Sequence, residues 1–233
     1  MLQLINWEIE SLIENCKLEI ENYFFVPALS SLLFLYIIII FSSIIHEYAH
    51  GWMAYQLGDP TAKMEGRLTL NPLAHIDPFG TVALPLILLL TSGVFIGYAK
   101  PVPFNPMNLR DPKRDTALVG AAGPSSNLFM ALALGLIVRF FGKMGFMVAL
   151  SPFLKFVVVI NIWLALFNLI PLPPLDGSRI LLGITPDSFG RWLFALERIG
   201  FASILIALMI AMVVLPSAVE FIFRLIVDQG FLF

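Results

Sequence analysis

The feature that most constrains this chain is an apolar run, Ser30 to Ile45, that ends in His46-Glu47-Tyr48-Ala49-His50. The run belongs to a longer predicted helix, from Val26 to about Tyr55, which Gly58-Asp59-Pro60 ends. Its apolar part is expected to lie in lipid. Ionisable residues at membrane depth are costly and tend to be retained for a function. The fold must therefore accommodate a polar cluster near the end of a membrane helix.

The spacing of the two histidines predicts a metal site. Residues four apart on a helix project from one face, so His46 and His50 can bind one ion. Glu47, between them, can hold a water molecule on that ion, as in the zinc-hydrolase pattern H-E-x-x-H. The alternative for so short a pattern is an ordinary polar patch at a helix end.

Composition narrows the class of protein. Hydrophobic residues make up 59% of the 233 residues and charged residues 13%, against roughly a quarter in soluble domains. The chain is therefore expected to be an integral membrane protein in a lipid bilayer. A formal charge of -2 gives no reason to expect a nucleic-acid partner, and no nucleotide-binding motif is found. Cys16 is the only cysteine, so a metal site must use His, Asp and Glu.

The predicted fold is an all-α, multi-pass bundle of about four to six spans. Residues 1–25, with five glutamates and one lysine, are expected to be an acidic leader or an interfacial helix, or else a disordered tail. Residues 26–233 are expected to form one transmembrane domain with its metal-binding core at about 30–180. The spans expected after the first are Ala117 to Phe141, Phe153 to Ile170 and Phe201 to Leu215. Pro216 is expected to separate the last of these from a final apolar segment.

A short stretch between the spans predicts a small membrane-associated β-hairpin. Arg67-Leu68-Thr69-Leu70-Asn71-Pro72 alternates polar and apolar residues before a turn signal.

The third metal ligand is expected on a different segment. Asp176 follows a span directly and lies after Pro171-Leu172-Pro173-Pro174, where the backbone can leave a helix and direct a carboxylate inward. The alternative is that Leu175-Asp176-Gly177 is an ordinary turn. His75 is another candidate for a metal ligand, in place of Asp176 or as an extra one. The alternative is that His75 is a turn or gating residue.

At this point the chain resembles the site-2 proteases, which are intramembrane zinc metallopeptidases, in a compact form without a PDZ domain. The resemblance rests on three motifs in the family's order: His46-Glu47-Tyr48-Ala49-His50, Gly123-Pro124-Ser125-Ser126-Asn127, and Asn168-Leu169-Ile170-Pro171 leading to Leu175-Asp176-Gly177. It implies one Zn²⁺ per chain, bound by His46, His50 and Asp176, with Glu47 as general base.

The resemblance also suggests residues that contact substrate. Asn127 and Asn168 would face the site and hold the substrate backbone or the oxyanion, although interhelical hydrogen bonding in lipid is the alternative for each. The segment Arg67, Leu68, Thr69 and Leu70 would present substrate as an added strand. The partners expected are transmembrane proteins or peptides. The sequence does not specify the oligomeric state.

The topology depends on an additional apolar stretch, Thr81 to Ala99. If this stretch crossed the membrane, Asp176 would emerge on the side opposite His46 and His50, so it is expected to be re-entrant, bending at Pro85 or Ser92-Gly93. Most basic residues then lie on the His46 side, and the positive-inside rule predicts an active site toward the cytoplasm. The membrane would be the cell membrane if the protein is prokaryotic. That side would carry Lys63, Arg67, Lys100, Arg110, Lys113, Arg114, Arg179, Arg191 and Arg198; the other would carry Lys17, Arg139, Lys143 and Lys155.

The expected function is zinc-dependent hydrolysis of peptide bonds in or next to transmembrane segments. Two alternatives from other classes are a zinc transporter or metal sensor, which would have several ligands along a pathway, and a non-catalytic membrane scaffold, which would usually lack a ligand or the base.

Overall fold

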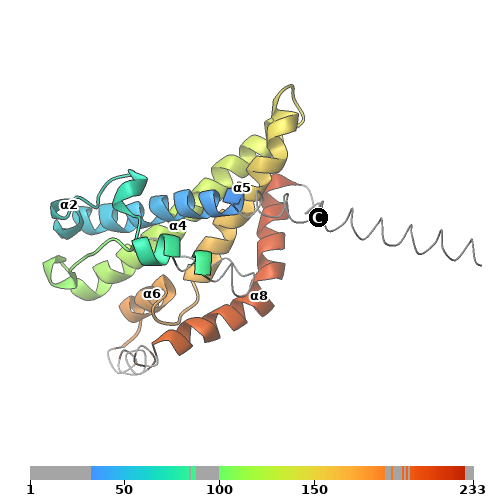
Figure 1. Cartoon of the computed structure of the whole chain (residues 1–233). Helices are drawn as coiled ribbons and strands as arrows, with labels where there is room; N and C mark the ends of the chain where they lie inside the picture. Colours follow the sequence, from blue (N-terminus) through green and yellow to red (C-terminus); the bar gives the residue numbers. More distant parts are fainter. Residues whose placement is uncertain are drawn as a thin grey trace, which may run out of the picture. The chain divides into compact units, whose positions relative to one another are not determined.

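The computed structural model describes residues 33–83, 85–87, 100–186 and 201–228, together with the single positions 190, 196, 198 and 200. The predicted leader at 1–25 lies outside these residues. The chain consists of two compact units, Met1–Ile39 and Ile40–Phe233. The first is described only as helix over 33–39. The second contains the helices that are labelled in Figure 1, and the site described below lies in it.

Four helices in the described part of the chain are long and apolar enough to cross a membrane: Leu33–Gln56, α4 (Pro112–Phe141), α5 (Met147–Asn168) and Ala202–Val227 within α8 (Phe201–Val227). Between them lie short elements: α2 (Thr61–Met64), the 3₁₀-helices η1 (Pro72–Ala74) and η3 (Pro106–Asn108), the π-helix η2 (Pro78–Ala83), and α6 (Asp176–Ile184). The predicted all-helical membrane fold is confirmed at this level.

Helix α4 is the central element, because α5, α6 and α8 all pack against it. Its first turn is capped by Asp111, whose side chain accepts a hydrogen bond from the backbone N–H of Arg114, and Pro112 occupies the first helical position. Gly135 allows α8 to approach closely, since a Cβ there would lie 2.3 Å from Ile226 Cγ2. Small residues at such crossings are typical of helix packing in membranes.

Helix α8 has one buried face and one apolar exposed face. The buried side chains recur every four residues and join the core formed with α4 and α5: Ala207, Ala211, Leu215, Val219, Phe223 and Val227. The opposite side exposes large apolar side chains such as Met209, Val213 and Phe221. An apolar exposed surface of this kind suits contact with lipid. The predicted break at Pro216 is wrong: α8 runs through it, as membrane helices tolerate proline.

The predicted β-hairpin at Arg67 to Pro72 is also wrong, since residues 67–71 are bends and coil and the described residues contain no strand. Arg67 is buried, and its guanidinium donates hydrogen bonds to the carbonyls of Ala74, Lys100 (2.8 Å) and Pro101 (3.2 Å). Asn71 then caps η1 by accepting from the N–H of Leu73. Polar side chains here fold the chain into a tight turn in place of a strand.

The two ends of the segment between His75 and Lys100 meet. The N–H of Lys100 donates to the carbonyl of His75 at 2.9 Å, and Arg67 binds carbonyls on both sides of the segment. Most of the stretch predicted to be re-entrant, at 84 and 88–99, lies outside the described residues. Its described beginning is helical, in η2 and at 85–87.

Candidate metal and catalytic site

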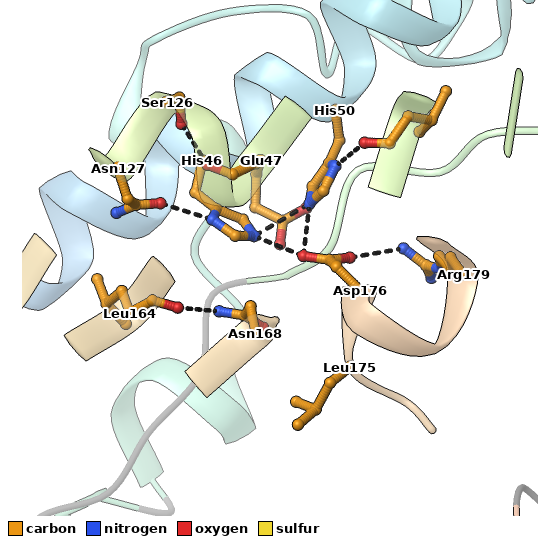
Figure 2. A network of polar contacts seen from close by, with 12 residues as sticks. His46, Glu47, His50, Ser126, Asn127, Leu164, Asn168, Leu175, Asp176 and Arg179 are labelled. Atoms are coloured by element: carbon orange, nitrogen blue, oxygen red, sulfur yellow. Dashed lines mark hydrogen bonds and ion pairs between the residues drawn. The ribbon is translucent and has the colours of Figure 1, made fainter. Parts of the chain in front are cut away.

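Two helices that are far apart in the sequence bring three potential ligands together. His46 and His50 lie one turn apart on Leu33–Gln56, and Asp176 is the first residue of α6. The Asp176 Oδ2 atom lies 3.0 Å from His46 Nε2 and 3.1 Å from His50 Nε2, and the two Nε2 atoms are 3.0 Å apart (Figure 2). All three side chains are buried. Within the described residues, this is the one group of three or more such side chains whose ligand atoms converge.

The position of Asp176 depends on the turn that precedes α6. Leu175 is extended at the N-cap, and the first turn of α6 lies against Leu169 and Ile170, which follow α5. Only a glycine fits at the next position, since a Cβ on Gly177 would lie 2.3 Å from the carbonyl oxygen of Leu169. Arg179 donates to the other oxygen of Asp176, Oδ1, at 3.2 Å. The carboxylate is therefore held with Oδ2 directed at the histidines.

The outer ring nitrogens of both histidines have acceptors. His46 Nδ1 lies 2.6 Å from Asn127 Oδ1, and His50 Nδ1 lies 2.6 Å from the carbonyl oxygen of Val119. A carbonyl oxygen only accepts hydrogen bonds, so each Nδ1 carries the proton. Both Nε2 atoms are then left with lone pairs directed at the site, as metal ligation requires.

This arrangement fits a zinc ion. Two imidazole nitrogens and a carboxylate oxygen face one another at 3.0–3.1 Å. With neutral rings this arrangement is repulsive, and a metal ion among the three atoms relieves the repulsion. Ligands at zinc–ligand distances of about 2.0–2.1 Å in a tetrahedron are roughly 3.3 Å apart, close to the separations found. Three protein ligands, with a fourth position for water, are typical of catalytic zinc.

Gly123 of α4 forms one wall of the site. A Cβ at this position would lie 2.3 Å from His50 Nε2 and 2.5 Å from His46 Nε2. No larger residue fits without displacing a ligand atom. The glycine of the Gly123-Pro124 motif is thus explained by close packing of α4 on the two imidazole rings.

The carboxylate of Glu47 is held by a segment without regular secondary structure, residues 100–105, here called the strap. The N–H of Val102 donates to Glu47 Oε2 at 2.8 Å. Further along the strap, the Phe104 ring lies 5.3 Å from the guanidinium carbon of Arg179. Arg67 binds its first two carbonyls. The strap therefore connects the predicted base with Arg179, which binds Asp176.

Asp59 anchors the far end of the strap. Its carboxylate accepts from the N–H of Asn105 at 2.6 Å, from the amide of Asn108 at 2.8 Å, and from Thr61. Burial alone would raise the pKa of Asp59, but these hydrogen bonds outweigh it and hold the pKa below its ordinary value. The sequence predicts only that Asp59 belongs to the turn that ends the first helix. It does not indicate the contacts with Asn105 and Asn108.

Other predicted site residues have different surroundings. Asn127 uses its carbonyl oxygen for His46 and its amide for Asn161, so it orients the His46 ring. Asn168 donates to Leu164 of its own helix, and its role toward substrate stays a prediction. His75 is buried, with Nε2 2.8 Å from the carbonyl of Thr69, and is not one of the three converging ligands.

Sequence reasoning missed several residues of the site: Asn161, Val102, Arg179 and Asp59. Of these, only Asn161 had a clear signal, because it is an amide in the middle of the apolar run of α5 and polar residues at membrane depth usually have a partner. Val102 acts through its backbone, which no side-chain pattern reveals.

Comparisons with known proteins agree with this geometry. Residues 34–212 match the model of peptidase family M50. YwhC of Bacillus subtilis is 39% identical over 192 residues, which cover 80% of this chain and 84% of YwhC. Rip2 of Mycolicibacterium smegmatis is 31% identical over 138 residues, which cover 59% of this chain and 51% of Rip2. Both relatives carry the name "putative zinc metalloprotease".

A more distant relative, named zinc metalloprotease MJ0392, comes from Methanocaldococcus jannaschii; it is 28% identical over 156 residues, 67% of this chain and 35% of that protein. No solved structure matches. The extent of the family match, the membrane-type helices and the His46–His50–Asp176 cluster together establish that the chain belongs to peptidase family M50, the site-2 proteases, and is an intramembrane zinc metalloprotease.

Proposed function

We propose that this protein hydrolyses peptide bonds in or next to the transmembrane segments of membrane-protein substrates, with His46, His50 and Asp176 as zinc ligands and Glu47 as general base. One observation carries the ligand assignment. The Nδ1 atom of each histidine faces a carbonyl acceptor. The Nε2 lone pairs of His46 and His50 and the carboxylate of Asp176 therefore converge on one point. A cation satisfies all three.

The chain's own residues divide the chemistry between them. A zinc ion bound by this donor set supplies Lewis-acid activation of water and of the scissile carbonyl. Glu47 accepts the proton of the attacking water and then donates it to the leaving amine. The N–H of Val102 holds Oε2 of Glu47, which leaves Oε1 for proton transfer. A substrate helix must first unwind locally, because its carbonyls are hydrogen-bonded internally.

A zinc transporter or sensor is the alternative from another class. Transport requires several ligand groups along a pathway across the membrane. Within the described ranges, one converging group of potential metal ligands is found, and it lies next to a glutamate in the arrangement of a hydrolase. These observations favour hydrolysis.

We further propose that the segment between His75 and Lys100 enters the membrane and returns, with the active site toward the cytoplasm. The hydrogen bond between its two ends supports re-entry, because a complete crossing would separate them by about 30 Å. With re-entry, nine basic residues lie on the His46 side, as the sequence predicted. Arg224, near the end of α8, adds a fifth to the opposite side and leaves the bias in place.

Cysteine labelling tests this topology. Cys16 is first replaced by serine, and single cysteines are introduced at Met64 and at Met107, whose side chains are 81% and 82% exposed. Both positions are expected to react with a membrane-impermeant reagent from the cytoplasmic side only, in inside-out vesicles. Labelling of the two positions from opposite sides would contradict re-entry, and labelling of both from outside would contradict the orientation.

The proposed activity is tested with purified protein in lipid vesicles. Membrane proteins retained by a Glu47→Gln form in native membranes are purified and incubated with the wild type, and new N-termini are identified by mass spectrometry. Cleavage within or beside a transmembrane segment is expected. A zinc chelator should stop it, and added zinc should restore it. A zinc-loaded wild type that cleaves none of these proteins would contradict the proposal.

A further inference from the structure

A row of buried hydrogen bonds runs from α5 through α4 to His46. Asn161 Nδ2 donates to the carbonyl of Val157 at 2.9 Å and lies 3.0 Å from Ser42 Oγ. Asn127 Nδ2 donates to Asn161 Oδ1 at 2.9 Å, and Asn127 Oδ1 faces His46 Nδ1 at 2.6 Å. We propose that Asn161 is a positioning residue for catalysis, which sets the tautomer of the zinc ligand His46 through Asn127.

Which group donates and which accepts in each hydrogen bond of this row is determined by the bond at its α5 end, between Asn161 and Val157. The Val157 carbonyl can only accept, so Asn161 must turn its NH₂ group toward it. The Oδ1 atom of Asn161 is then left to accept from the NH₂ group of Asn127. That in turn places Asn127 Oδ1, an acceptor, against His46 Nδ1. His46 must therefore carry its proton on Nδ1 and present the Nε2 lone pair to the metal.

The burial of the row makes this direction strict. Asn161 and Asn127 are 0% and 1% exposed, so water does not replace a lost partner, and a buried unpaired amide is costly. Without an acceptor at position 161, the Asn127 amide gains by rotating. Its NH₂ group would then face His46 Nδ1 and favour the tautomer with the proton on Nε2, which cannot bind zinc.

His50 provides the internal comparison. Its Nδ1 donates directly to the backbone carbonyl of Val119, so its tautomer is fixed without a side chain. Each of the two histidines is thus connected to a backbone carbonyl. His50 donates to one directly, and His46 is connected to one through Asn127 and Asn161. Only the route to His46 can be altered by side-chain substitution.

Three variants test the proposal, with zinc affinity measured by chelator competition in detergent. Asn161→Leu removes donor and acceptor, and its zinc affinity is expected to fall about 10- to 100-fold, with an altered absorption spectrum of the Co²⁺-substituted protein. Asn161→Asp, protonated when buried, keeps one donor and one acceptor and should restore most of the affinity. Ser151→Ala is the control: it removes a hydrogen bond of the same helix, to Gly142, and should bind zinc like the wild type.

The outcomes separate positioning from a general structural role. A folded Asn161→Leu protein with wild-type zinc affinity would overturn the proposal. So would an Asn161→Asp protein that binds zinc as weakly as the leucine variant, because a structural defect alone predicts no rescue.

A measurement on the unaltered protein covers the case in which the variants do not fold. The chain has three histidines, so ¹⁵N-histidine labelling gives three ring systems in solid-state NMR. The structure predicts protonated Nδ1 on the two zinc-bound rings and protonated Nε2 on His75, which faces the Thr69 carbonyl. An unprotonated Nδ1 on zinc-bound His46 would overturn the proposal, because the row through Asn127 requires a proton there.

Discussion

Replacing Glu47 by glutamine is expected to abolish proteolysis while leaving zinc bound. Glutamine has nearly the same shape and keeps an oxygen that can accept from the N–H of Val102, so the side chain should stay in place. It cannot accept a proton from water, and loss of a general base lowers rates by roughly 10²- to 10⁴-fold. Turnover of a purified substrate and zinc content per chain are the two measurements.

The control for this variant is Glu65→Gln, which removes the same charge from an exposed position at the end of α2. It should keep wild-type turnover. A Glu47→Gln protein that retains more than about a tenth of wild-type activity would exclude Glu47 as the base, since that loss is smaller than base removal produces. Loss of zinc together with activity would instead assign Glu47 to metal binding.

Adding one carbon atom at Gly123 is expected to damage the site as severely. The Cβ of an alanine would lie 2.3 Å from His50 Nε2 and 2.5 Å from His46 Nε2, so α4 or the imidazole rings must move. We expect a loss of zinc affinity of at least about 100-fold, as for loss of ligand geometry, and little remaining proteolysis. The substitution should not weaken α4 itself, because alanine favours a helix by about 1 kcal/mol over glycine.

This opposition of effects makes the Gly123→Ala experiment diagnostic. The helical content of the zinc-free protein, measured by circular dichroism, should be unchanged, although zinc binding is lost. Ser125→Thr is the matched control, since it adds one carbon atom to the same helix at an exposed position and should leave zinc binding unaltered. Normal zinc affinity in Gly123→Ala would show that the rings do not pack on α4 as described.

The three side chains proposed as metal ligands could be identified from the sequence because each depends on a local rule. Two histidines four apart on a helix must share a face, and an aspartate among prolines directly after a span is free to turn inward. The structure brings all three together. The long helices were predictable for a similar reason, since apolar length alone determines them.

Features that depend on distant backbone partners were not predictable. The alternation from Arg67 to Pro72 suits a strand, but a strand needs a partner, and here the Arg67 side chain binds three carbonyls and folds the segment into a turn. The break predicted at Pro216 was wrong for a different reason: membrane helices tolerate proline, and α8 continues through it. The contact of Val102 with Glu47 uses an N–H group that every residue except proline has.

The bond between His75 and Lys100 has a consequence for how members of this family can diverge. Because Arg67 and this bond hold both ends of the intervening segment at one place, the strap begins at a position that does not depend on the length of that segment. Residues can be inserted or deleted there without shifting the register of Val102 against Glu47. The length of the segment can thus change while the contact between Val102 and Glu47 is kept.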